Sequence, residues 1–167
     1  MSEVRANPVV NIADVPLEDH GHGTKFGAKI GEVGQALGGS GVGCMYYEVP
    51  PGKRAFPFHA HHVQHELFYI VEGTGTYRFG TRTFPLKAGD VCVAPPGGAE
   101  VAHQIVNDGD KVLKYLGFST DMTGPEIVEY PDSGKFSTTM RGPDGETRLF
   151  RFVGRKDSAV DYWDGEE

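Results

Sequence analysis

Histidines are concentrated in one short stretch of this 167-residue chain. Four of the seven histidines lie between His59 and His65, and the carboxylate of Glu66 follows directly. Side chains two residues apart on a β-strand point to the same face of the sheet, so His59 and His61 can reach one point in space. Imidazoles and carboxylates are ligands that divalent transition metals accept. The stretch therefore predicts a mixed nitrogen and oxygen metal site, for which His103, the only histidine further along the chain, is available as a fourth ligand.

The rest of the composition indicates the fold that would position these side chains. Glycine accounts for 24 residues and proline for 11, which favours frequent turns over long helices. Short strand-like runs alternate with glycine, proline and aspartate turns, as in β-sandwiches and barrels. We therefore expect an all-β domain, with strands at Gly43 to Val49, Glu66 to Val71, Gly75 to Phe79, Thr83 to Leu86, Val91 to Ala94, Val101 to Val106 and Lys111 to Ser119.

Length and charge limit the classes of protein that need consideration. The length suits one domain over residues 1–167, with a barrel core at about 43–119 and flanking extensions at 1–42 and 120–167. The formal net charge is -7 and no basic patch is visible, which argues against a nucleic acid partner. Residues 1–16 contain no uninterrupted apolar stretch. We therefore expect neither a secretory signal nor a membrane span, and a cytoplasmic location.

The two flanks give weaker signals. The segment from Gly21 to Gly43 is rich in glycine, so we expect either an irregular segment or an arm that pairs with a second subunit. A turn at Gly142 to Gly145 predicts a hairpin that continues into Thr147 to Phe152. The only tryptophan, Trp163, lies near the C-terminus, where we expect it to dock on the domain.

The histidine stretch resembles the first signature motif of the cupin family. That motif contains a glycine, a short spacer, His-x-His, a glutamate and a second glycine, which here are Gly52, His59, His61, Glu66 and Gly73. The spacer before the first histidine is six residues long where five is usual. A loop ahead of the strand should absorb this difference.

The second cupin motif also has a counterpart in this chain. It contains a glycine, Pro-x-Gly, a histidine and an asparagine, which here are Gly89, Pro95, Gly97, His103 and Asn107. Three extra residues separate the second glycine from the histidine, and the inserted Gly98-Ala99-Glu100 lies in a turn. We expect this insertion to enlarge a loop at the barrel mouth without removing His103 from the site.

The resemblance implies a cupin double-stranded β-helix, or jelly-roll barrel, to which the flanks add strands or arms. It also implies that His59, His61, Glu66 and His103 are metal ligands. His103 shares strand parity with Val101 and Ile105 and should face inward, where a buried imidazole needs a partner. This ligand set suits one divalent ion of iron, manganese, nickel, cobalt or zinc.

Several further side chains are candidates for roles around the metal. His62 has the opposite strand parity and should point outward, whereas His65 is placed to contact Glu66 from outside the ligand shell. Glu100 is the remaining candidate for a general base. For substrate binding the candidates are Lys114, Arg54, Tyr69 and Tyr77, which offer cations or ring edges but also fit a solvated face or a core.

Two classes of function fit these features. The first is a metal-dependent enzyme on a small oxygenated substrate, because small cupins of this outline look like those grouped with sugar-phosphate isomerases of the mannose-6-phosphate type, and also with dioxygenases. The second is a non-catalytic module that binds a small ligand, such as a sugar or an auxin-like acid, through the same metal. In either case we expect a homodimer with a small-molecule ligand.

Overall fold

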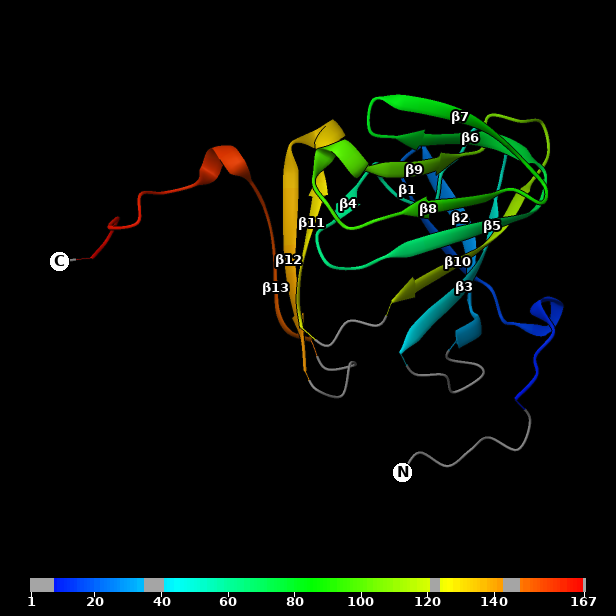
Figure 1. Cartoon of the computed structure of the whole chain (residues 1–167), viewed down its shortest axis with the longest axis horizontal. Coiled ribbons are helices and arrows are strands. Elements are labelled where there is room, and N and C mark those ends of the chain that lie inside the picture. Colours follow the sequence, from blue (N-terminus) through cyan, green and yellow to red (C-terminus); the bar gives the residue numbers. More distant parts are fainter. Residues whose placement is uncertain (1–7, 35–40, 121–123, 143–147, 167) are drawn as a thin grey trace.

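The computed structural model describes residues 8–34, 41–120, 124–142 and 148–166. The regular structure in these ranges is β-strand with short 3₁₀ turns (Figure 1). Both flanks contribute strands, which confirms the predicted all-β fold with additions at each end. In chain order the elements are η1 (Ile12–Asp14), β1 (Glu18–His22), β2 (Phe26–Glu32), β3 (Val42–Val49), β4 (Ala60–His61), β5 (Glu66–Glu72), β6 (Thr74–Phe79), β7 (Arg82–Lys87), β8 (Val91–Ala94), η2 (Ala99–Val101), β9 (His103–Val106), β10 (Leu113–Thr120), β11 (Pro125–Tyr130), η3 (Pro131–Ser133), β12 (Lys135–Arg141), β13 (Arg148–Arg155) and η4 (Lys156–Ser158).

The strands form three sheets. A six-stranded sheet in the order β1-β2-β3-β10-β5-β8 and a three-stranded sheet in the order β7-β6-β9 make the barrel. A four-stranded sheet in the order β13-β12-β11-β4 stands beside it, at the left of the barrel in Figure 1. The two-residue strand β4 belongs to the histidine stretch, yet it pairs with β11, where His61 lies opposite Val128. The C-terminal flank is therefore hydrogen-bonded to the predicted metal site.

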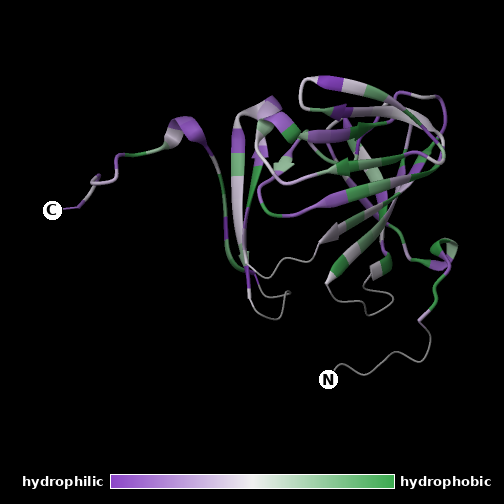
Figure 2. Cartoon of the chain, viewed as in Figure 1, coloured by the Kyte–Doolittle hydropathy of each residue, from purple (hydrophilic) through white to green (hydrophobic). Residues whose placement is uncertain are grey.

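The barrel core follows from alternating burial along its strands. In β10, Leu113, Tyr115 and Gly117 face inward, and the residues between them are more exposed. Val49 and Leu113 are completely buried, and the rings of Tyr47 and Tyr115 stack with their centroids 4.7 Å apart. Hydrophobic and hydrophilic residues alternate along several barrel strands (Figure 2), and the buried ones form a core cluster that includes Val49, Leu113 and Tyr115.

Two motif residues have structural roles in this barrel. Gly73, between β5 and β6, has φ of +89°, a left-handed conformation that favours glycine. Asn107 is fully buried, and its amide group donates to the carbonyl oxygens of Val49 and Lys111, both at 2.7 Å. Its side-chain oxygen accepts from the N–H of Gly109 at 3.1 Å. These residues fix turns of the barrel and do not contact the metal candidates.

The flanks differ from the sequence expectations in two places. Residues of the glycine-rich N-terminal segment form β1 and β2, and β2 pairs with β3 of the same chain, so the described part is a regular hairpin and not irregular. All five residues of β1 are exposed, so this strand lacks the alternation of apolar and polar residues from which a strand is predicted. Trp163 is 70% exposed and does not dock on the domain.

The C-terminal hairpin is confirmed as an antiparallel pair of β12 and β13, although residues 143–147 of its turn lie outside the described residues. In the ranges that the structure describes, no helix is long and apolar enough to cross a membrane.

Candidate metal centre

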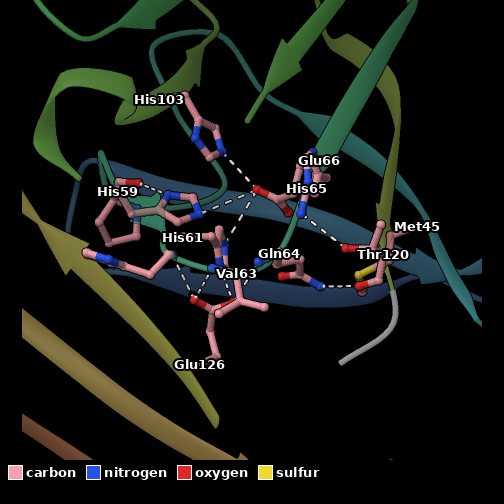
Figure 3. A network of polar contacts seen from close by, with 12 residues as sticks. Met45, His59, His61, Val63, Gln64, His65, Glu66, His103, Thr120 and Glu126 are labelled. Carbon is pink, nitrogen blue, oxygen red and sulfur yellow. Dashed lines mark hydrogen bonds and ion pairs between the residues drawn. The ribbon is translucent and has the colours of Figure 1, made fainter. Parts of the chain in front are cut away.

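The structure brings His59, His61, Glu66 and His103 to one end of the barrel interior (Figure 3). His61 lies in β4, Glu66 begins β5 and His103 begins β9. His59 precedes β4 and forms a reciprocal backbone bridge with His103, with N–O distances of 3.1 and 2.7 Å. The strand of His103 is shorter than predicted, because Val101 lies in the 3₁₀ turn η2. His103 nevertheless faces inward with Ile105, and the insertion before it does not displace it.

The carboxylate of Glu66 lies at the centre of this cluster. Its Oε2 atom is 2.9 Å from Nε2 of His103, 3.5 Å from Nε2 of His61 and 3.9 Å from Nε2 of His59. One ligand atom each from His59, His61 and Glu66 lies within 4.8 Å of the others. Figure 3 shows the three imidazoles converging on this oxygen. These three residues have the spacing of ligands around a common point, and His103 lies outside this group but contacts the same oxygen of Glu66.

The buried polar atoms of the cluster fit a cation. Nδ1 of His61 and Nδ1 of His103 are buried without a hydrogen-bond partner among the described residues, and the buried Oε2 of Glu66 and Nε2 of His103 lie 2.9 Å apart in a geometry that makes no regular hydrogen bond. Unpaired buried polar atoms are costly, and native structures usually satisfy them with a protein group, a water or an ion. Three imidazoles and one carboxylate are a donor set that divalent transition metals accept. The residues present therefore fit the metal that the sequence predicts.

The protonation states also suit metal binding. Burial, together with the neighbouring His103 and His61, lowers the pKa of His59 to about 3, so its imidazole is neutral near pH 7. Burial opposes ionisation of Glu66, but the adjacent imidazoles outweigh it and hold the pKa of this carboxyl below its usual range. The cluster thus offers a neutral imidazole and an ionised carboxylate, which are the forms that bind metals.

A cavity of about 390 Å³ opens above the cluster. Its walls are largely aromatic, and its polar contributors include Gln64, Gln104 and Arg141. Gln104 is buried and already committed, because it accepts from Arg78 at 2.8 Å and donates to the carbonyl of Phe56 at 2.7 Å. Arg141 is exposed and comes from β12. The cavity has the volume of a small-molecule site and is lined by both aromatic and polar side chains.

Sequence reasoning missed Glu126, a carboxylate on the second side of His61. Glu126 lies in β11 and is only 3% exposed. Its Oε2 atom is 3.8 Å from Nδ1 of His61, the ring nitrogen that faces away from Glu66. His61 therefore lies between two carboxylates, one from the barrel and one from the C-terminal sheet.

Glu126 also fixes the backbone that follows His61. Its carboxylate accepts from the N–H groups of His62 at 2.8 Å, Val63 at 3.2 Å and Gln64 at 2.9 Å (Figure 3). Burial opposes ionisation of Glu126, but His61 and the backbone donors outweigh it, so the pKa of this carboxyl is below its usual range. No local pattern around Glu126 signals this role, since it depends on the pairing of β11 with β4.

The four substrate-binding candidates from the sequence lie outside the described lining of this cavity. Lys114 forms an ion pair with Glu72 at 2.8 Å on the outer surface, and Tyr69 is 40% exposed. Tyr77 is buried and donates to the carbonyl of Val93 at 2.8 Å. Arg54 lies with its guanidinium carbon 5.9 Å from the ring centroid of Phe26.

The remaining candidates also point away from the cluster. His62 is exposed, as its parity predicts, and its Nε2 atom is 2.9 Å from Oε1 of Glu129. His65 is exposed and its backbone N–H donates to Oγ1 of Thr120 at 3.1 Å. Glu100 is exposed and accepts from the N–H of Gly98 within its own turn at 3.0 Å. None of these three lines the cavity among the residues described.

Solved structures share this architecture. The chain superimposes with a TM-score of 0.74 on a protein from Acidithiobacillus ferrooxidans that bears a provisional sugar phosphate isomerase name, at 22% identity and covering 92% of this chain and 95% of that one. It superimposes with a TM-score of 0.73 on a cupin-superfamily sugar phosphate isomerase from Silicibacter pomeroyi, at 21% identity and covering 94% of this chain and 98% of that one. At these identities the likeness shows the fold, which is the cupin double-stranded β-helix with additional strands.

Sequence comparison gives a shorter match. An oxalate-binding protein from Thermotoga maritima is 35% identical over 69 residues, which are 41% of this chain and 54% of the relative. The chain spans about half the length of the first curated relatives it matches. The family profile described as the cupin domain matches residues 45–118, which include all four metal-ligand candidates. Residues 45–118 therefore match a cupin domain, as the resemblance carried by the two motifs predicts.

Proposed function

We propose that this protein is a metal-dependent enzyme whose substrate is a small oxygenated anion of the sugar phosphate class. The observation that carries the proposal is the cluster of His59, His61, Glu66 and His103 at the floor of a cavity of about 390 Å³. The names of the two sugar phosphate isomerases with the same fold support the substrate class. Iron, manganese, nickel, cobalt and zinc all suit the ligand set.

The surrounding residues suggest how such a substrate binds. The bound ion would supply a Lewis acid for a carbonyl or hydroxyl oxygen of the substrate. Tyr47, Tyr115 and Tyr130 contribute aromatic walls to the cavity that a substrate would enter. Arg141 also lines the cavity, and the planar donors of a guanidinium recognise phosphate well.

The first experiment measures metal and ligand together. Metal analysis of the freshly purified protein should give about one transition-metal ion per chain, and a panel of aldose and ketose phosphates should include one that is isomerised. Arg141→Ala should raise the KM for a sugar phosphate by roughly tenfold or more, because it removes a charged hydrogen-bond partner. Arg82→Ala, which changes an arginine stacked on Phe84 outside the described lining, is the matched control and should leave KM unchanged.

A second candidate function is the metal-dependent binding of a small dicarboxylate without turnover. Glu66 is the only carboxylate in the described lining of the cavity, so a metal-bound Glu66 would leave no spare carboxylate base there. The oxalate-binding relative supports this ligand class. Tight calorimetric binding of oxalate, with no sugar phosphate isomerised, would favour this candidate over the enzyme.

A dioxygenase activity is the third possibility from the sequence, and an oxygen-uptake assay of the iron-loaded protein tests it. Uptake that depends on an added organic substrate would replace the isomerase proposal. A protein with metal but without ligand binding, isomerisation or oxygen uptake would contradict all three functions.

A further inference from the structure

The face of the C-terminal sheet that points away from the barrel is unusually apolar. Strand register puts Ile127 of β11 opposite Thr138 of β12, and Thr138 opposite Phe152 of β13. Residues of this parity face away from Glu126, which points to the barrel. They include Ile127, Met140, Phe150 and Phe152, whose exposed fractions range from 39% to 51%. Contiguous exposed apolar surface of this kind marks an interaction site.

The outer strand of this sheet is also unprotected. β13 is an edge strand in the described sheet, and seven of its eight residues are exposed. Natural edge strands are usually covered or interrupted, because their unpaired backbone groups recruit other chains. β13 carries Arg148 and Arg151, which form no ion pair with any residue that the structure describes. Arg148 shares the parity of Phe150 and Phe152, whereas Arg151 pairs with Thr139 opposite Glu126 and lies on the other face of the same edge strand. The β13 edge is therefore positively charged beside the apolar face.

The segment after η4 has the complementary character. Val160, Tyr162 and Trp163 are 73%, 83% and 70% exposed, and the rings of the two aromatics meet edge-on with centroids 4.8 Å apart. Asp161, Asp164 and Glu166 make the same segment acidic. Figure 1 shows this tail, in red, projecting from the C-terminal sheet on the side away from the barrel. An exposed aromatic pair flanked by carboxylates is complementary to an apolar and basic surface.

A groove of about 570 Å³ lies on the outward face of the sheet. Ile127, Phe136 and Phe152 line it, and the start of the tail, at Ala159 and Val160, forms one of its walls. The tail then leaves the groove, so its own aromatic pair does not fill it. The groove is open to a tail that approaches from another molecule.

We propose that the tail of one copy of this chain, residues 160–166, binds the outward face and the β13 edge of a second copy. The tail of the second copy binds the same surface of the first copy. Tyr162 and Trp163 fill the apolar groove, while Asp161 and Asp164 run along the β13 edge, within reach of Arg148 on the outward face and Arg151 on the other face. A two-fold dimer buries both copies of a self-complementary patch at once, and opposite charges fix the register. This dimer is independent of the reaction catalysed in the barrel.

The first test measures mass and tryptophan burial over a dilution series of the full chain. Light scattering after size exclusion should give twice the chain mass at high concentration. Trp163 is the only tryptophan, so its emission should shift to shorter wavelength as the dimer forms. Trp163→Ala should give a monomer with an unchanged circular dichroism spectrum and metal content.

A charge swap makes the test specific. Arg148→Glu with Arg151→Glu, or Asp161→Arg with Asp164→Arg, should each yield monomers because the tail and the β13 edge then repel each other. An equimolar mixture of the two double variants restores both contacts, as does a chain carrying all four changes, and both should be dimeric. Lys114→Glu, on the far outer wall, is the control and should remain dimeric.

Three outcomes would overturn the proposal. The wild-type chain could be monomeric at every concentration. Trp163 could be buried at all dilutions in a monomer, which would place the tail on its own chain. A dimer that survives Trp163→Ala and both charge reversals would use another surface.

Discussion

The barrel wall and the C-terminal sheet meet at His61 but contribute to the site in different ways. The barrel wall presents Glu66, whose Oε2 atom lies amid three imidazoles, 2.9 Å from Nε2 of His103, and accepts no backbone N–H from the described residues. The C-terminal sheet presents Glu126, whose carboxylate accepts three backbone N–H groups. Both carboxylates are buried near the same histidine. Because their partners differ, Glu66 is available to bind a cation, whereas Glu126 holds His61 in position.

The largest effect should come from removing the residue that both regions share. His61→Ala removes a proposed ligand, and metal analysis should find stoichiometric metal lost, a larger effect than the roughly 10–100-fold loss of affinity typical of residues that only orient a ligand. His62→Ala is the matched control, because this neighbouring side chain is exposed and faces Glu129. Full metal content in His61→Ala would refute the proposed ligand set.

The contribution of the C-terminal sheet is tested at Glu126. Glu126→Gln keeps one acceptor oxygen but loses the second, so the metal affinity should fall by roughly 10–100-fold in competition with a chelator. Glu126→Ala leaves the part-buried N–H groups of Val63 and Gln64 unpaired, while that of His62 keeps the carbonyl of Ile127, and should cost about 2 kcal/mol in the free energy of unfolding.

Glu129→Gln is the control for this pair of variants. Glu129 lies on the same strand but faces His62 and Lys156, so the Glu129→Gln substitution should change neither the metal affinity nor the stability appreciably. If Glu126→Gln bound metal as tightly as wild type, the C-terminal sheet would have no positioning role.

The pH dependence of stability should reveal the buried His59. Its pKa falls from an ordinary 6.5 to about 3 on folding, so the unfolded chain binds more protons between these values. Stability of the metal-free protein should therefore decrease as pH falls, by about 2 kcal/mol from pH 7 to pH 5 for this residue alone.

Denaturant unfolding of the metal-free protein at the two pH values measures this loss. His59→Asn, which does not titrate in this range, should show a correspondingly smaller pH dependence. An equal loss of stability in wild type and His59→Asn would show that His59 is not buried in its neutral form.

The smallest effect should come from the outer surface of the barrel wall. Lys114 pairs with Glu72 in solvent, where such ion pairs contribute little. Lys114→Ala should leave metal content, ligand affinity and melting temperature close to those of wild type. A marked loss of ligand affinity in this variant would return Lys114 to the binding site.

The sequence predicted the parts of the molecule whose structure follows from the pattern of neighbouring residues. The strands of the barrel follow alternation and turn residues, and His59, His61, Glu66 and His103 follow from motif spacing. Lys114 was ambiguous because both faces of β10 carry apolar residues: Leu113 and Tyr115 inside, and Leu116 and Phe118 outside. Alternation alone cannot choose a face in such a strand.

The unpredicted part depends on pairing between distant segments. Glu126 acts through contacts with residues 62–64, more than 60 positions earlier in the chain. An isolated glutamate in a strand carries no signal of those contacts, because they arise only when β11 pairs with β4. The β1–β2 hairpin was missed for another reason, since its exposed first strand has no apolar alternation to detect.

The pairing of β4 with β11 also bears on how such proteins are subdivided. The family profile ends at residue 118, whereas the acceptor for the backbone of His62, Val63 and Gln64 is Glu126. A fragment cut at the end of the profile would keep every proposed ligand and still leave those three donors unpaired. The shortest segment that can be transplanted with its metal affinity intact therefore extends at least through β11. Grafting the motif-bearing strands alone into another barrel should transfer the ligands without their rigidity.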